Sequence, residues 1–195
     1  MSAFVLKIIA AVSMLLDYVG AILISPAEYP YVYLAFRALG RLSLPIFVYL
    51  LVEGFHHTSD FNKYLKRIGI FALISVIPFD LAMYQTRFGT DIFSDINSIF
   101  AGGYNEEKLG QLIINLFSYQ NVLVTFFCGL LLLNIMRNVE KKYAKNMAVV
   151  NLLNGLLTIG FCLLTSIIGG DYSISTILML VAFYLFRDNK ILIGV

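Results

Sequence analysis

Apolar residues follow one another through most of this chain, and only short polar clusters interrupt them. The longest runs include AVSMLL, LPIFVYLLV, FFCGLLLLNIM and ILMLVAFYLF. None of them alternates between apolar and polar positions, as a membrane β-strand would. Hydrocarbon offers no hydrogen-bond partner to the backbone, so an apolar segment of about 20 residues crosses it as a helix. The pattern predicts an all-α fold, a polytopic transmembrane helix bundle of about six spans.

The predicted spans fill most of the chain. They lie near residues 4–24, 31–52, 66–84, 120–137, 147–168 and 173–187. The long connection 85–119 is expected to be an outer loop, whose last part, QLIINLFSYQ, re-enters the membrane or lies on its surface. Hydrophobic residues make up 59% of the 195 residues and charged residues 13%, about half of the charged share of a soluble domain. We therefore assign residues 1–195 to a single integral membrane domain.

Lysine and arginine lie mostly in alternate connections, which predicts the orientation, because cytoplasmic loops hold an excess of them. The basic connections and tail carry Lys63, Lys66, Arg67, Arg137, Lys141, Lys142, Lys145, Arg187 and Lys190, whereas the opposite loops carry only Arg87 and Lys108. Both termini are therefore expected on the cytoplasmic side of a bacterial inner or plasma membrane. Lys7, near the start of the first span, is expected to extend to the same surface.

Composition also removes some classes of partner. The net charge is only +2, and no basic patch interleaved with aromatic residues occurs outside the short loops, so we expect no nucleic-acid partner. Cys128 and Cys162 both lie within apolar runs, where cysteine usually serves as a small buried hydrophobic residue rather than as half of a disulfide. The histidines and carboxylates lack the usual spacing of metal ligands, so no metal site is predicted.

Several charged residues fall within or beside the predicted spans, where an ionised side chain costs at least about 2.5–3.5 kcal/mol. They are Asp17, Arg37, Arg41, Asp80 and Asp171. Arg37 and Arg41 are one helical turn apart, so the like charges need carboxylate neighbours. We expect Arg41 to pair with a carboxylate, first of all Asp17. The cluster is interpreted either as a structural ion network or as a polar chamber, open to the outer side, that holds a substrate.

The segment EGFHHTSDFNKYLKR, at the inner edge of the second span, contains both histidines of the chain. Glu53 and His57 are four residues apart, so on a continuing helix the carboxylate can orient the imidazole as a general base requires. His56 must then point elsewhere, toward headgroups or loop. The alternative interpretation is that both histidines only pack at a helix end.

The chain resembles the TraX family, whose named member acetylates the N-terminus of conjugative pilin. The resemblance runs in family order through KIIAAVSMLLDYVG, GRLSLPIFVYLLVEGFHHTSDFNKYLKR, FALISVIPFDLA, NVLVTFFCGLLLL and GGDYSISTILMLVAFYLFR. The window that joins EGF, HT, KY and R, followed by IPFDLA, is its most specific part. The family commonly has Asp-His where this chain has Asp17-Tyr18.

The resemblance implies transfer of an acetyl group from acetyl-coenzyme A to an amine or hydroxyl of a protein N-terminus, glycan or lipid. Under this hypothesis His57 is the base and Glu53 orients it, while Lys63, Lys66 and Arg67 hold the coenzyme. The buried charges, together with Tyr172, would bind the acceptor, and Arg41 would either do so or stabilise charge on the thioester oxygen. Arg41 is 16 residues from His57, roughly 24 Å along a straight helix, so we favour a binding role.

Two other functions fit the same sequence. Asp17, Arg41 and Asp80 could relay ions or protons in a small ion-coupled transporter or channel. The chain could also be a non-catalytic assembly factor for surface structures. Binding of acetyl-coenzyme A would distinguish the enzyme from both alternatives.

Overall fold

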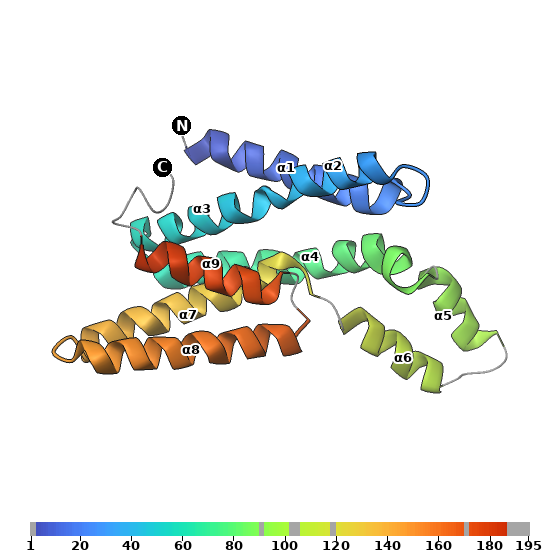
Figure 1. Ribbon diagram of the computed structural model, residues 1–195. Helices are drawn as coiled ribbons and strands as arrows, with labels where there is room; N and C mark the ends of the chain where they lie inside the picture. Colours follow the sequence, from blue (N-terminus) through green and yellow to red (C-terminus); the bar gives the residue numbers. More distant parts are fainter. Residues whose placement is uncertain (1–2, 90–91, 102–105, 118–119, 170–171, 187–195) are drawn as a thin grey trace.

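The chain is folded almost entirely into helices. The computed structural model describes residues 3–89, 92–101, 106–117, 120–169 and 172–186, and within them the chain forms nine α-helices and no β-strand (Figure 1). The helices are α1 (Ala3–Leu23), α2 (Pro30–Arg41), α3 (Ser43–His57), α4 (Phe61–Phe88), α5 (Ile92–Phe100), α6 (Glu106–Phe117), α7 (Val122–Lys142), α8 (Met147–Ile167) and α9 (Ser173–Leu185). The predicted all-α fold class is confirmed.

Five helical segments of the described chain are long and apolar enough to cross a membrane. They are Ala3–Leu23, Pro30–His57, Phe61–Tyr84, Val122–Lys142 and Met147–Ile167. The sixth predicted span corresponds to α9, whose 13 residues rise only about 20 Å at 1.5 Å per residue. Three helical segments also extend past the predicted ends into polar sequence, because intrahelical hydrogen bonds continue where hydropathy falls. These are the α2–α3 segment, α4 and α7.

The second span is interrupted at Leu42, which separates α2 from α3. Pro45 explains the position of the break: it has no N–H group to donate to the carbonyl of Arg41, four residues earlier, and its ring crowds that carbonyl. Leu42 directly follows Gly40 and Arg41 at the end of α2, and Gly40 packs against Asp17 of α1. The second span is therefore interrupted next to Asp17 and Arg37.

The chain ends of several helices gather at one end of the bundle. Figure 1 shows that the start of α1, the turn between α3 and α4, the α7–α8 turn and the end of α9 all lie at the same end. We call it the basic end, because Lys63, Lys66 and Arg67 begin α4 there and Lys141, Lys142 and Lys145 surround the α7–α8 turn. This arrangement agrees with the alternation of basic and acidic connections in the sequence.

Reporter fusions test the predicted orientation of the basic end. A reporter fused after Lys145 or after Val195 should be cytoplasmic, and one fused after Tyr104 should be on the outer side, because lysine and arginine are retained on the cytoplasmic side. Alkaline phosphatase and green fluorescent protein activities of the fusions give the two readings. An outer signal at Val195 would show that the chain does not cross the membrane an even number of times.

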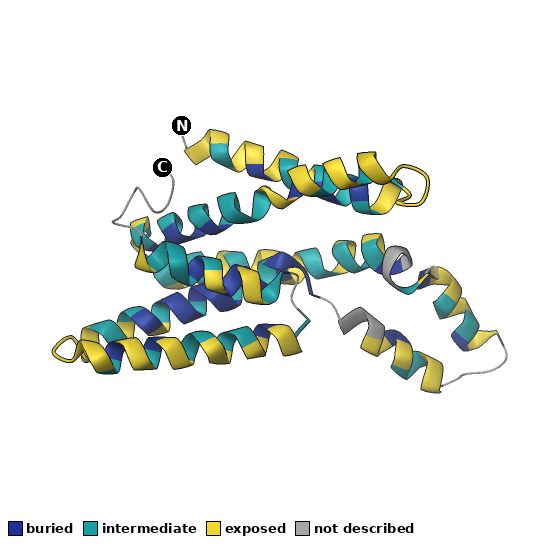
Figure 2. Cartoon of the chain, in the orientation of Figure 1, coloured by how far each residue is buried: buried dark blue, intermediate teal, exposed yellow. Residues whose placement is uncertain are grey.

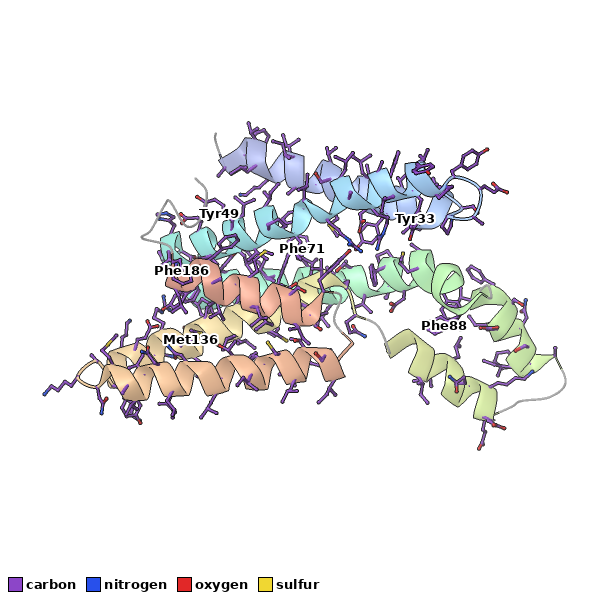
Figure 3. The ribbon with its side chains drawn as sticks, viewed as in Figure 1. Tyr33, Tyr49, Phe71, Phe88, Met136 and Phe186 are labelled. Carbon is purple, nitrogen blue, oxygen red and sulfur yellow. The ribbon has the colours of Figure 1, made fainter. Side chains whose placement is uncertain are left out.

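The main core forms around α7, which contacts α3, α4, α8 and α9. Figure 2 shows buried residues concentrated along it. Met136, labelled in Figure 3, is fully buried there, as is Val48 of α3. At the first turn of α7, the Asn121 side chain caps the amides of Leu123 and Val124 and donates to the carbonyl of Ala72 on α4 at 3.2 Å. This bond fixes where α4 crosses α7.

The predicted outer loop 85–119 contains two helices that the hydropathy pattern did not indicate. Helices α5 and α6 form a hairpin that extends beyond the end of α4 (Figure 1). A small second core joins them to α4 through Tyr84, Ile92, Ile99 and Leu112. The Tyr84 hydroxyl also donates to Asp95 at 2.7 Å. Each helix is too short to be predicted as a span. Its buried residues become evident only from the packing in this second core.

Candidate functional site

Glu53 and His57 form the predicted contact on the last turns of α3. His57 Nε2 lies 3.0 Å from Glu53 Oε2, and the side chains are 71% and 28% exposed. An ionised carboxylate can only accept a hydrogen bond, so in the neutral imidazole the proton of this bond is on Nε2. Nδ1 then holds the free lone pair. The arrangement is that of an oriented base whose reactive nitrogen is accessible.

The pair lines a cleft of about 370 Å³ between the start of α1 and the end of α3. Its lining residues are Ala3, Leu6 and Lys7 from α1 and Tyr49, Leu50, Glu53, Gly54 and His57 from α3. Figure 3 labels Tyr49 on this part of α3. Most of the lining residues are apolar, and Lys7 and Glu53 are the charged residues of the lining. The sequence did not indicate that Lys7 belongs to this site, because only the packing of α1 on α3 brings it there.

His56 packs within the bundle, so the expectation that it faces headgroups or loop is wrong. Its ring stacks on Tyr184 of α9, with centroids 5.4 Å apart and planes inclined by 29°. Its Nδ1 donates to the carbonyl of Val52 at 2.9 Å. The Tyr184 hydroxyl donates to Glu140 of α7 at 2.8 Å, and Glu140 also accepts from Asn154 of α8 at 3.4 Å. Three helices, α7, α8 and α9, thereby hold the end of α3.

Arg137, which the sequence placed in a cytoplasmic connection, lies within α7 and also supports α3. Its guanidinium carbon is 4.6 Å from the centre of the Phe55 ring, close enough for a cation–π contact. It also donates to Asn134 at 3.1 Å. Arg137 and Glu140 thus act in the packing of the basic end. Their position at the end of an apolar run does not indicate either role.

The predicted coenzyme-binding residues lie beside the cleft but do not line it. Lys63, Lys66 and Arg67 belong to the first two turns of α4, which begins four residues after His57. Lys63 pairs with Asp60, with Nζ and Oδ2 3.2 Å apart. The Lys63 main-chain amide, and then its ammonium, lower the pKa of the Asp60 carboxyl. The role of these basic residues in binding coenzyme A stays a prediction.

A second polar site surrounds Asp17, whose partner differs from the predicted one. Arg37, not Arg41, forms the ion pair, with Nη1 2.8 Å from Asp17 Oδ1. Gly40 accounts for the difference: it packs directly against Asp17, so close that a Cβ there would lie 2.6 Å from the Asp17 Cα. Within the described residues Arg41 is exposed and acts on Asp17 only through its longer-range positive charge.

Asp17 also lines a small cavity of about 20 Å³ at the break between α2 and α3. Tyr18, Ser43 and Tyr172 supply its other polar walls. Tyr172 adopts the left-handed conformation, with φ 52° and ψ 28°, which is uncommon for a residue other than glycine, and its side chain hydrogen-bonds to Asp17. The cavity is the size of one water molecule, so it does not hold an acceptor as the structure stands.

Of the other charges of the predicted chamber, Arg41 and Asp80, which the structure describes, do not line this cavity. Asp80 lies on α4. Asp171 lies outside the described residues. The cavity at Asp17 and the cleft at His57 have no lining residue in common. The candidate base, His57, and the ion pair of Asp17 and Arg37 therefore belong to separate sites. The 16-residue spacing of Arg41 and His57 predicts such a separation.

Comparison with known proteins places this architecture in a family. The family model described as "TraX protein" matches residues 2–193, almost the whole chain. The chain belongs to the TraX family. A curated protein of Dichelobacter nodosus, "Probable fimbrial assembly protein FimC, serogroup H1", is 42% identical over 74 residues, which are 38% of this chain and 30% of that protein. No solved structure matches.

This member of the TraX family carries Tyr18 where the family commonly has histidine. Its ring packs edge-on against Phe79 of α4, with centroids 5.9 Å apart and planes inclined by 78°. A tyrosine hydroxyl is a poor base near neutral pH, because its usual pKa is about 10. Tyr18 thus supports the contact between α1 and α4, and His57 is the candidate base in this chain.

Proposed function

We propose that this chain transfers an acetyl group from acetyl-coenzyme A to an amine or hydroxyl of a membrane or envelope acceptor. One observation carries the proposal: His57, held by Glu53 at 3.0 Å, lines an apolar-walled cleft at the basic end of the bundle. A base with a free nitrogen in a cleft is the minimum that acyl transfer needs. Membership of the TraX family supports this chemistry over others that a base could perform.

The reaction uses the pair in two steps. The acceptor nitrogen or oxygen attacks the thioester carbon while His57 Nδ1 takes its proton, and the carbonyl electrons move onto oxygen. The tetrahedral intermediate then collapses, the C–S bond breaks, and the imidazolium returns the proton to the coenzyme A sulfur. The acceptor gains the acetyl group and coenzyme A leaves as the thiol. Glu53 stabilises the imidazolium formed between the two steps.

The cleft suits the thioester arm rather than the whole coenzyme. Its volume of about 370 Å³ lies at the lower end of the range for small-molecule sites, about 300–1,000 Å³. The acetyl group and part of the arm would fill it, and the phosphates would remain at the rim. Lys63, Lys66 and Arg67 are the basic residues that follow the end of α3, so they would hold these phosphates.

The acceptor is proposed to belong to a cell-surface structure. The resemblance implies a pilin N-terminus for the named family member, and the Dichelobacter nodosus relative is described as a fimbrial assembly protein. Asp17, Arg37, Arg41, Asp80, Asp171 and Tyr172 remain the residues proposed to bind the acceptor. The cavity at Asp17 is only about 20 Å³. An acceptor that binds there must therefore move α2 and α3 apart at Leu42.

Acetyl-coenzyme A binding tests the proposal directly. The purified protein in detergent should bind radiolabelled acetyl-coenzyme A with saturation, and unlabelled coenzyme A should compete. Mass spectrometry of membrane proteins and envelope glycans, with and without the protein, should show an acetyl group that only its presence adds. If the folded protein does not bind the coenzyme and proton-coupled uptake appears in vesicles, the transporter replaces the enzyme.

A further inference from the structure

We propose that Lys7 is a catalytic residue of the cleft, whose ammonium stabilises the negative charge that develops on the thioester oxygen. The inference rests on the proposed function and adds a residue to it. Hydropathy alone assigns Lys7 to the membrane surface, where its stem would cover lipid and its charge would meet water. The structure instead includes Lys7 in the lining of the cleft that holds Glu53 and His57.

The packing of α1 directs Lys7 toward α3. Ala3 and Leu6 line the cleft together with Lys7, and Ala10, three residues further along, is fully buried. These residues lie at helical spacing on one side of α1. The opposite side exposes apolar residues such as Phe4 and Ile8, which suit lipid contact. Lys7 is exposed and lies at the edge of this packed side, where it also lines the cleft.

Lys7 is available to a ligand. Of the residues that line the cleft, it is the one with a permanent positive charge. Within the described part of the chain it forms no ion pair, unlike Lys63, which pairs with Asp60. Glu53, which lines the same cleft, is bonded to His57.

The reaction needs a positive group at this position. When the acceptor attacks, the thioester carbonyl becomes an oxyanion, and a preorganised cation or donor near that oxygen lowers the barrier. The sequence left this role open for Arg41 but favoured acceptor binding, because Arg41 is 16 residues from His57 on the α2–α3 segment. The structure agrees in that Arg41 does not line the cleft. Lys7 lines the cleft together with the base. The oxyanion and the proton taken by His57 would then be stabilised within one cavity.

The test compares Lys7→Met and Lys7→Arg with a matched control, Lys145→Met, which removes an exposed lysine from the α7–α8 turn at the same end. Radiolabelled acetyl-coenzyme A and membranes that lack the protein supply donor and acceptor, and transfer is followed as label retained on membranes. Lys7→Met should lower kcat by about 10²–10³-fold, the range for loss of one oxyanion donor. The Kd for acetyl-coenzyme A should change by less than about threefold. Lys7→Arg should restore at least part of the loss, and Lys145→Met should match wild type.

Each result separates the possibilities. A rise in Kd with unchanged kcat would mean that Lys7 binds a phosphate group, and an unchanged reaction would mean that it has no role; both overturn the inference and leave the proposed function standing. A thermal melting curve in detergent shows that Lys7→Met is folded, and the Lys7→Arg result excludes a purely structural loss. A folded wild-type protein that neither binds acetyl-coenzyme A nor transfers label overturns the proposed function, and the inference with it.

Discussion

Replacing His57 with alanine should lower acetyl transfer by about 10²–10⁴-fold, the usual contribution of a positioned general base. This range corresponds to roughly 3–5 kcal/mol of activation free energy. The affinity for acetyl-coenzyme A should stay within a few fold, because the imidazole acts on the attacking group rather than on the coenzyme. The side chain is 71% exposed and contributes only the bond to Glu53, so its loss should leave the fold intact.

His56→Ala is the informative comparison, because it removes the same chemical group from the adjacent position. His56 stacks on Tyr184, so its replacement should lower the melting temperature while each folded molecule keeps its turnover. Turnover and coenzyme affinity are measured in detergent for both variants, normalised to the folded fraction from gel filtration. Wild-type turnover in His57→Ala would remove His57 as the base and with it the mechanism at the basic end.

Local spacing was enough to predict the pair at the end of α3. Residues four apart on a helix face each other whatever surrounds them, so Glu53 and His57 could be paired once the helix was predicted. The same rule says that His56 points away from the pair, but not toward what. Its contact with Tyr184 joins residues that are 128 positions apart, and only the path of α9 past the end of α3 brings them together.

The buried ion pair shows why distant contacts could not be predicted. The spacing of Arg37 and Arg41 places both on one face of α2, and either could reach a carboxylate on α1. The choice depends on where the two helices cross. Gly40 sets this point, because only a residue without a side chain lets α2 approach Asp17 so closely. Moving the crossing point by one helical turn would change the partner of Asp17 from Arg37 to Arg41. The sequence pattern does not indicate where along α2 the two helices cross.

The α5–α6 hairpin was missed for a related reason. Its helices are 9 and 12 residues long, and polar residues interrupt their apolar positions. Helices of this length are marginal on their own, and α5 and α6 pack with Tyr84 of α4 in a small core. Length and hydropathy predict spans well because hydrocarbon requires long apolar helices, whereas short helices depend on contacts that the sequence does not display.

Gly40→Ala should be among the most destabilising single changes in this chain. An added Cβ would lie 2.6 Å from the Asp17 Cα and 2.7 Å from its Oδ1, far inside contact distance. Because the nearest atoms include backbone, a side-chain rotation cannot relieve the clash, and α1 must move away from α2. Overpacking of this kind costs about 1–3 kcal/mol. The displacement would also separate Asp17 from Arg37, and breaking this partly buried ion pair adds to the loss.

Gly155→Ala is the matched control, since it makes the same chemical change in the middle of α8. A Cβ at Gly155 meets no atom within 4 Å, and alanine favours a helix over glycine by about 1 kcal/mol, so this variant should melt at or slightly above the wild-type temperature. Gly40→Ala should melt well below it and yield less folded protein. Melting followed by gel filtration in detergent compares the two variants directly. Equal melting temperatures would show that α1 and α2 do not approach as closely as the contact at Gly40 requires, and the account of why Asp17 pairs with Arg37 would then fail.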